Sequence, residues 1–343
     1  MDQGRHMAEE IAEQPAVIER LLRDGGAQIR SVAAALRRHD LRFVLFAARG
    51  TSDHAALYGK YLAEIELGMP AGLASPSTGT VYGARPDLRG VLFVTVSQSG
   101  GSPDLLDALA VARSCGAVTL AITNNPDSEL ARAAEHSIYV HAGVERAVAA
   151  TKSYVAELLA LWLLVAALRD HPADAAAPLA EAAQRTLGSA EVIEAAAARY
   201  RFADRMITTA RGYSYPSARE GALKLMETSY LGAQAFSGAD LLHGPMAMVD
   251  ASTPVIAVVT PGRGGQAMAP VLEALRARRA DLLIVGAGGD DAPGLPVYTD
   301  GIAESLHPVL EIMPMQQLAL ELALHRGENP DAPRGLSKVT QTW

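Results

Sequence analysis

The chain has almost no cysteine, few aromatic residues and no excess of positive charge. Cys115 is the one cysteine among 343 residues, which excludes an intramolecular disulfide and any cysteine-clustered zinc or iron–sulfur site. There are 30 Lys and Arg against 38 Asp and Glu, a formal net charge of −8. This acidic balance argues against nucleic acid as a partner, because non-specific binding to it needs basic surface. With 5% aromatic residues, the core must consist mainly of Ala, Leu, Val and Ile.

Targeting segments and long apolar runs are also missing. The first ten residues are polar and contain no apolar signal-peptide segment. The longest charge-free apolar run, 158–168, is too short for a bilayer, which takes about 20 residues to cross. We therefore expect a cytoplasmic protein with no membrane partner. The composition, 49% hydrophobic and 20% charged, is typical of a soluble globular protein, and the length predicts about two domains.

Apolar runs that each end in a turn recur along the chain, and such runs are typical of strands buried on both faces of a parallel sheet. They predict strands over 43–48, 91–96, 118–123 and 138–140, and again over 206–210, 254–259, 282–285 and 297–298. Helical spacing predicts helices over 8–38 (two helices separated by Gly25-Gly26), 51–66, 103–114, 151–168, 178–200, 214–230 and 308–324. The alternation indicates an α/β fold whose parallel sheet is wrapped by helices.

Two features at the ends of predicted strands occur twice in the sequence, with nearly the same separation between the two copies. Arg49-Gly50 and Arg211-Gly212 each follow a predicted strand and lie 162 positions apart. Ser97 and Thr260, at the ends of two further strands, lie 163 positions apart. This spacing indicates an internal duplication. Coincidence is the alternative, because strand–glycine–helix units are common.

The loop 97–102, Ser-Gln-Ser-Gly-Gly-Ser, lies between a predicted strand and a predicted helix. Ligands bind at this edge of parallel sheets. Hydroxyls, an amide, backbone N–H groups and a helix N-terminus together suit a phosphate dianion. The loop has neither the lysine of a nucleotide P-loop nor a Gly-x-Gly-x-x-Gly pattern, so a phosphorylated small molecule fits better than a nucleotide. The alternative is a simple turn whose serine caps the helix. The second half has Pro-Gly-Arg-Gly at 261–264 instead, and we expect no second phosphate site there.

The predicted helix 214–230 carries the best acid–base candidates. Glu220, Lys224 and Glu227 share one face of it. A solvated Glu–Lys pair is the alternative, but the rest of the helix is largely apolar, which favours a cleft where a partly buried glutamate could move protons. His243 is held by the Gly-Pro turn that follows it, and His54 is a weaker candidate. The spacing of His, Asp and Glu predicts no metal site.

Six motifs in order resemble the sugar isomerase (SIS) family, and in particular the isomerase half of glucosamine-6-phosphate synthase. They are ARGTSDHA at 48–55, SQSG at 97–100, VAATK at 148–152, EGALKLME at 220–227, HGP at 243–245 and GLSK at 335–338. The resemblance implies an α/β fold of two tandem SIS domains, each a five-stranded parallel sheet between helices in three αβα layers. It implies N-terminal helices at 1–40, a first SIS domain at 41–172, linking helices at 173–200, a second SIS domain at 201–328 and a tail at 329–343 that closes the site.

The resemblance also implies residue roles, a hexose or hexosamine 6-phosphate ligand, and a homodimer with shared active sites. We expect no cofactor and no metal. The residues it implies for binding phosphate and sugar are Gly50, Thr51, Ser52, Ser97, Gln98, Ser99, Ser102, Val148 and Ala150. Glu227 would move the proton between C1 and C2, supported by Lys224 and Glu220. His243, from its own or the neighbouring subunit, would open the ring. Lys338 would approach the carbonyl carbon, where a buried lysine with a lowered pKa is a good amine nucleophile.

Three residues depart from the synthase pattern. Arg49 replaces a cysteine and could add a charge beside the pocket, Gly101 replaces an acidic residue, and Ala150 replaces a serine near the sugar. The synthase also has an N-terminal glutaminase domain that this sequence lacks. We therefore expect the reverse reaction, conversion of glucosamine 6-phosphate to fructose 6-phosphate and ammonia. The alternatives are a fructosamine-6-phosphate deglycase, another phosphosugar isomerase, or a non-catalytic phosphosugar sensor, which would need only the phosphate loop.

Overall fold

The computed structural model describes residues 3–287 and 293–338, which form two compact units. The first unit comprises residues 16–145, 152–177 and 337–338. The second unit comprises residues 3–15, 146–151, 178–287 and 293–336. The units are therefore interleaved along the chain. The predicted domain boundaries stay a prediction.

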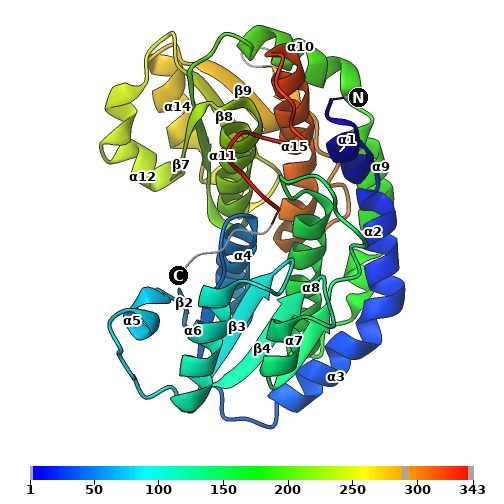
Figure 1. Cartoon of the computed structure of the whole chain (residues 1–343). Coiled ribbons are helices and arrows are strands. Elements are labelled where there is room, and N and C mark those ends of the chain that lie inside the picture. The colour runs from blue at the N-terminus through cyan, green and yellow to red at the C-terminus, as the bar shows by residue number, and fades with distance from the viewer. Residues whose placement is uncertain (1–2, 288–292, 339–343) are drawn as a thin grey trace. The chain divides into compact units, whose positions relative to one another are not determined.

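The first unit contains a five-stranded sheet (Figure 1). Its strands are β1 (Phe43–Ala47), β2 (Ala71–Leu73), β3 (Val91–Ser97), β4 (Val118–Thr123) and β5 (His136–Tyr139). Their order across the sheet is β2-β1-β3-β4-β5, and every neighbouring pair is parallel. The carboxyl ends of β1 and β3 therefore lie next to each other, which places the loops after Ala47 and Ser97 side by side.

The second unit repeats this topology. Its strands are β6 (Arg205–Ala210), β7 (Gly232–Ser237), β8 (Pro254–Val259), β9 (Asp281–Gly286) and β10 (Gly294–Leu295). Their order is β10-β9-β8-β6-β7, again all parallel. In both sheets the second strand lies outside the first, and the third to fifth strands follow on the other side. The predicted fold class is confirmed, and this shared order supports the predicted duplication.

Helices cover both faces of the first sheet (Figure 1). The apolar faces of α6 (Pro103–Ser114) and α7 (Glu129–Ala133) pack on one side, around Phe93 and Ala121. On the other side lie α3 (Gly26–Leu36), α4 (Thr51–Glu66) and α8 (Lys152–Leu168). Residues 152–166 of α8 are all buried, because this helix packs against both α3 and α4. The remaining helical segments are α2 (Gln14–Arg20), a π-helical turn (Leu21–Gly25), α5 (Ser77–Thr80) and a 3-10 turn (Ala173–Ala176).

The second sheet is covered in the same way. α12 (Gly238–Leu242) and α14 (Ala269–Ala277) pack on one face, around Val255 and Ala257. α11 (Tyr215–Ser229), α15 (His307–His325) and α10 (Ala190–Tyr200) pack together on the other. α11 and α15 approach so closely that a Cβ at Gly221 would lie 1.9 Å from the Met315 Cε atom. The remaining helical segments are α1 (Arg5–Ala12), α9 (Leu179–Leu187), α13 (Arg263–Gln266) and 3-10 turns at Gly212–Ser214, Pro245–Met248 and Glu304–Leu306.

Helix α1 belongs to the second unit, although it precedes every strand of the chain. Its Met7 and Ile11 side chains are buried against Ala147 and Leu320. Its first turn is capped from far along the chain, because the Asp331 carboxylate accepts hydrogen bonds from the N–H groups of His6 (3.0 Å) and Met7 (2.8 Å). A carboxylate at a helix N-terminus also interacts favourably with the helix dipole.

The predicted strands differ from the structure at three places. The strand predicted at 297–298 is wrong, because the fifth strand of the second sheet is Gly294–Leu295. β2 and β7 were not predicted, since β2 has three residues and β7 begins with glycine and is mostly not buried. Among the described residues, no helix is long and apolar enough to cross a membrane.

Candidate active site

The loop that joins β3 to α6 is the one that the sequence predicts to bind phosphate. Gly100 has a φ of 64°, and a Cβ there would lie 2.2 Å from the Ser128 Oγ atom, so only glycine fits. The loop is braced internally, because the N–H of Gly100 donates to Ser97 Oγ (3.2 Å) and that of Gly101 donates to Ser99 Oγ (3.4 Å). Ser102 precedes α6, but its side chain makes no capping hydrogen bond. Its hydroxyl is therefore not committed to the helix, which disfavours the simple capping alternative.

The neighbouring loop, between β1 and α4, carries an ion pair that the sequence did not predict. The Arg49 guanidinium lies 2.7 Å from the Asp104 carboxylate, and Asp104 is buried in the first turn of α6. About half of the Arg49 side chain is exposed. Arg49 therefore links the two loops at this edge of the sheet. The charge that Arg49 was expected to add beside the pocket is largely balanced by Asp104.

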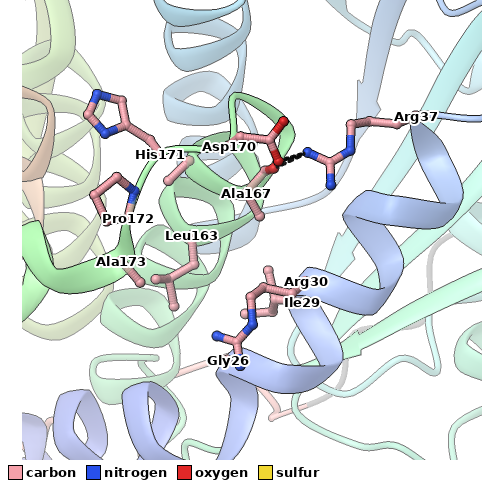
Figure 2. A pocket seen from close by; sticks show the side chains of 11 residues that line it. Gly26, Ile29, Arg30, Arg37, Leu163, Ala167, Asp170, His171, Pro172 and Ala173 are labelled. Atoms are coloured by element: carbon pink, nitrogen blue, oxygen red, sulfur yellow. Dashed lines mark hydrogen bonds and ion pairs between the residues drawn. The ribbon is translucent and has the colours of Figure 1, made fainter.

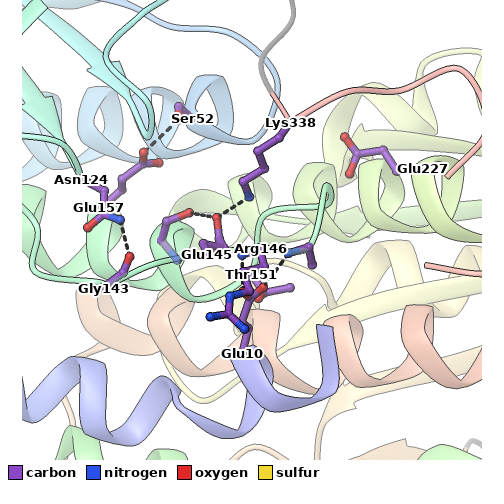
Figure 3. Close-up of polar contacts among 12 residues, drawn as sticks. Glu10, Ser52, Asn124, Gly143, Glu145, Arg146, Thr151, Glu157, Glu227 and Lys338 are labelled. Carbon is purple, nitrogen blue, oxygen red and sulfur yellow. Dashed lines mark hydrogen bonds and ion pairs between the residues drawn. The ribbon is translucent and has the colours of Figure 1, made fainter. Parts of the chain in front are cut away.

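Ser52 and Thr51 begin α4 after Gly50, whose φ is 56°. The hydroxyl of Ser52 is buried and donates a 2.9 Å hydrogen bond to the carboxylate of Glu157 on α8 (Figure 3). This contact ties the start of α4 to α8 within the first unit. Ser52 was predicted to bind the sugar, and its hydrogen bond to Glu157 was not predicted.

Helix α11 brings together the three predicted acid–base residues. The Lys224 Nζ atom lies 3.3 Å from the Glu220 carboxylate and also donates to the Glu227 carboxylate. The side chains of Lys224 and Glu220 are fully buried, whereas that of Glu227 is 22% exposed. The alternative of a solvated surface pair is therefore wrong. Of the three side chains, only that of Glu227 is partly exposed.

The electrostatics of this group depend on Lys224. Burial is the largest single influence on the pKa of Lys224 and lowers it, but the carboxylates of Glu220 and Glu227 together outweigh burial, so the pKa is raised. The ammonium therefore stays charged. It places a fixed positive charge beside the Glu227 carboxylate.

The loop 146–151 carries Val148 and Ala150 and lies with the second unit. Both residues are half-buried. The loop is held by Glu10 of α1, whose carboxylate accepts from the N–H groups of Arg146 and Ala147, and by Gln316 of α15, which donates to the carbonyl oxygen of Thr151 (3.2 Å). These contacts fix the backbone of the loop predicted to line the sugar pocket.

Lys338 has a carboxylate partner in the first unit (Figure 3). Its Nζ atom lies 3.0 Å from the carboxylate of Glu145, which is fully buried and also accepts from the backbone and hydroxyl of Ser153. The Lys338 side chain is 26% exposed. The predicted role of Lys338 as an amine nucleophile stays a prediction.

The two histidine candidates differ in exposure. His243 follows α12 and is exposed, and its backbone N–H donates to the Asp240 carbonyl oxygen (3.0 Å). Gly244 after it has a φ of 134°, which favours glycine there. His54, within α4, is buried. An exposed position suits a group that must meet a substrate, so His243 stays the better candidate.

In the second unit, the loop 261–264 corresponds to the loop 97–102 of the first unit, and a carboxylate occupies it. We call it the closed loop. The backbone N–H groups of Arg263 and Gly264 donate to the carboxylate of Glu304, at 2.9 Å and 2.7 Å. A Cβ at Gly262 would lie 2.3 Å from the Glu304 carboxyl carbon. The loop is therefore filled by a carboxylate of the chain itself, in line with the expectation that it holds no second phosphate.

A buried glutamate that was not predicted lies beside this loop. Glu311 of α15 is fully buried and accepts hydrogen bonds from Ser214 (2.7 Å), Ser217 (3.0 Å) and Thr260 (2.6 Å). Burial raises the pKa of Glu311, although these hydroxyls and His307 oppose the shift. The pair Ser214–Glu311 repeats the pair Ser52–Glu157 of the first unit, with a serine at the start of one helix bonded to a glutamate of the last helix.

Two surface pockets lie away from these loops. One of about 330 Å³ in the first unit lies between α3 and the end of α8 (Figure 2), where Arg37 pairs with the Asp170 carboxylate and donates to the Ala167 carbonyl oxygen (2.9 Å). Another of about 380 Å³ in the second unit is bounded by α1, α9, α10 and α15. The residues that line them are not those predicted for the active site.

Comparisons with known proteins place the chain in a family. The SIS domain model matches residues 40–167 and 200–324. The glutamine–fructose-6-phosphate aminotransferase of Methanothermobacter thermautotrophicus is 35% identical over 341 residues, which cover 97% of this chain and 56% of that protein. The chain thus spans little more than half the length of this relative. It belongs to the SIS family, as predicted, with one SIS match in each half.

Solved structures agree with this assignment. A Silicibacter pomeroyi protein assigned as a phosphosugar isomerase has 34% identity and a TM-score of 0.87, over 95% of this chain and 99% of that one. The C-terminal domain of glucosamine-fructose-6-phosphate aminotransferase from Francisella tularensis has 27% identity and a TM-score of 0.83, over 96% of this chain and 98% of that one. Both similarities extend over nearly the whole of both chains.

Proposed function

We propose that this chain is a phosphosugar isomerase that converts glucosamine 6-phosphate and water to fructose 6-phosphate and ammonia. One observation carries the proposal. Lys224 is fully buried between two carboxylates, and only Glu227 of the three is partly exposed. A buried charge is costly unless it is paired, and here the arrangement leaves one carboxylate available to substrate beside a fixed positive charge. This is what a general base for proton transfer needs.

The phosphate of the sugar would bind at the loop 97–102. The N-terminus of α6 and the hydroxyls of Ser99 and Ser102 would supply donors there, favoured by the helix dipole. The likeness to glutamine–fructose-6-phosphate aminotransferases supports a hexose 6-phosphate as the ligand class. We extend the site by proposal to Gly50, Thr51, Gln98, Val148 and Ala150, and to a second subunit of a homodimer, which could supply His243.

The chemistry balances without a cofactor. After ring opening, which we assign to His243, Glu227 takes the proton from C2 and returns it to C1. A second proton moves from the nitrogen to O1, so that C1 becomes an alcohol and C2 an imine. One water then converts the imine to the ketone and releases ammonia. The positive charge of Lys224, supported by Glu220, keeps Glu227 in place during both proton transfers.

The test is an assay of fructose 6-phosphate and ammonia from glucosamine 6-phosphate. We expect Glu227→Gln to lower kcat by about 10²- to 10⁴-fold, the usual contribution of general acid–base catalysis, while KM stays similar. Glu191→Gln, at an exposed position at the start of α10, is the matched control and should retain full activity. Equal rates for wild type and Glu227→Gln would refute the role of Glu227.

A second candidate is a deglycase for fructosamine 6-phosphates. The half-exposed guanidinium of Arg49 favours it, because it could bind a carboxylate on the amine substituent. Asp104 already pairs with Arg49, which makes this candidate second. A panel of hexosamine and fructosamine 6-phosphates separates the two functions, since the deglycase would release an amino acid in place of ammonia. Binding of these sugars without any product would indicate a sensor.

A further inference from the structure

A group of metal-ligating side chains lies in the first unit, away from the loops of the proposed active site. His39 follows α3, and Glu135 and His136 lie at the start of β5. The ligand atoms of these three residues all lie within 4.8 Å of one another. His39 precedes β1, so the group is at the amino-terminal edge of the sheet, whereas the loop 97–102 is at the carboxyl edge.

Neither histidine is hydrogen-bonded to the carboxylate. The Nε2 atoms of His39 and His136 lie 3.9 Å and 3.7 Å from the same Glu135 oxygen, which is too far for a hydrogen bond. The Nε2 atom of His136 is buried and has no hydrogen-bond partner among the residues that the structure describes. A buried polar atom without a partner is costly and calls for an explanation.

The backbone at each of the three positions is fixed. The His39 N–H donates to the Leu36 carbonyl oxygen (3.0 Å), and the His39 carbonyl oxygen accepts from Leu41 (3.0 Å). The Glu135 N–H donates to the Thr119 hydroxyl (3.0 Å). His136 pairs with Leu120 of the neighbouring strand. The ligand set is therefore held by an ordered scaffold and needs only side-chain rotation to close on an ion.

We propose that His39, Glu135 and His136 bind a divalent transition-metal ion such as Zn²⁺. Zinc takes imidazole nitrogen and carboxylate oxygen at about 2.0–2.2 Å, so ligand atoms of a tetrahedral site lie about 3.4 Å apart. The observed separations of 3.9 Å and 3.7 Å are slightly wider. Two imidazoles and one carboxylate suit zinc and its neighbours better than Mg²⁺ or Ca²⁺, which prefer oxygen ligands alone. Water would complete the coordination, because the site faces solvent on one side.

The position indicates a structural role for the ion. β5 is one of the two edge strands of the first sheet, and the ion would tie its first residue to the segment that joins α3 to β1. Binding to the folded state alone stabilises that state by mass action. The ion would therefore strengthen the edge of the sheet without taking part in the proposed reaction.

The test is calorimetric titration of the untagged full chain, freed of metal by chelator, with Zn²⁺. We expect saturable binding of one ion by wild type. His136→Ala and the nearly isosteric Glu135→Gln should bind at least tenfold more weakly, because mutating even a residue that only hydrogen-bonds to a metal ligand lowers metal affinity about 10- to 100-fold. His171→Ala removes an exposed histidine of the same unit and is the matched control, which should bind as wild type does. Thermal unfolding with excess Zn²⁺ should shift upward for wild type and for His171→Ala only.

Two results would overturn the proposal. One is an absence of saturable binding below about millimolar Zn²⁺, a concentration at which binding is weak. The other is equal affinity for wild type and Glu135→Gln, a variant that keeps the shape of the side chain and so guards against loss of binding through misfolding.

Discussion

The two loops that follow the third strand of each sheet differ in what their backbone N–H groups face. In the first unit the loop 97–102 is braced by its own serines and leads into a helix of 12 residues. In the second unit the carboxylate of Glu304 accepts from the N–H groups of Arg263 and Gly264. The strand order is the same in both units. In the same place of one fold, backbone N–H groups thus donate to the loop's own serine hydroxyls in the first unit and to a carboxylate from outside the loop in the second.

The helices that follow the first strand of each sheet, α4 and α11, also differ. Here it is the second unit that buries its charged side chains. Helix α11 of the second unit buries its glutamate–lysine pair, Glu220 and Lys224, completely. In α4 of the first unit, the pair Lys60 and Glu64 at the same spacing is 29% and 36% exposed. Two units with the same strand order thus differ in where they bury charged side chains, so fold alone does not locate function. The proposed function assigns phosphate binding to residues of the first unit and proton transfer to residues of the second.

The largest expected effect comes from breaking the buried pair. Lys224→Met leaves the buried Glu220 carboxylate uncompensated, and removing one partner of a buried pair costs about 3–5 kcal/mol of unfolding free energy. Lys60→Met removes the exposed pair of α4, which is worth less than about 1 kcal/mol. Urea unfolding of both variants measures the difference. Glu220→Gln combined with Lys224→Met should recover part of the loss, and equal losses in α4 and α11 would contradict the comparison.

The next effect concerns the open loop of the first unit. Ser102→Ala should raise KM for the sugar phosphate about tenfold with little change in kcat, because a hydrogen bond to a charged group contributes about 1.5–3 kcal/mol. The stability of α6 should hardly change, since the serine makes no capping bond. Steady-state kinetics of Ser102→Ala and of Arg263→Ala, from the closed loop, check this. A similar rise in KM for Arg263→Ala would mean that both loops bind substrate.

A smaller effect is expected from the closed loop itself. Glu304→Gln weakens a charged acceptor of two backbone N–H groups, so the free energy of unfolding should fall by about 1–2 kcal/mol. KM should not change, because the loop is not proposed to bind substrate. Denaturant unfolding beside assay of the same preparations tests both statements, with Glu129→Gln at the exposed start of α7 as the control. Unchanged stability would mean that the carboxylate does not hold the loop.

The smallest effect is a dependence on pH in the second unit. Burial raises the pKa of Glu311 in the folded state, so the folded chain holds this proton more firmly than the unfolded chain does. The extra stability that protonated Glu311 gives the folded state is fully present below the ordinary glutamate pKa. It is lost as pH rises through the raised pKa of the folded state. Wild type should therefore lose stability relative to Glu311→Gln as pH rises above the ordinary glutamate pKa. A difference that does not vary with pH would show that Glu311 titrates alike in both states.

The elements that could be predicted from the sequence are those with a continuous local pattern of apolar residues. Apolar runs marked the interior strands, and their repeated spacing indicated two units of one kind. The edge strands β2 and β7 were missed, because a short strand or one with an exposed face has no continuous apolar run. The position of the last strand was wrong for the same reason, since Gly294–Leu295 has only two residues.

The same limit applies to the site. Glu220, Lys224 and Glu227 share one helix, so their spacing alone predicted that they meet. Partners from distant elements could not be predicted, because nothing local marks them. Glu157 lies 105 positions from Ser52, and Glu311 lies 97 positions from Ser214. The group formed by His39 and residues 135–136 is equally distant in sequence, which is why spacing indicated no metal site.

The carboxylate of Asp331 has a consequence for the order of folding during synthesis. It caps α1 from more than 320 positions further along the chain, so α1 leaves the ribosome long before its cap exists. At 5–20 residues per second this interval is roughly 15–65 s. During that time the first unit's sheet can form from segments already made, whereas the second unit still lacks strands, helices and the cap of α1. We expect nascent chains stalled before residue 331 to leave α1 open to protease, and completed chains to protect it.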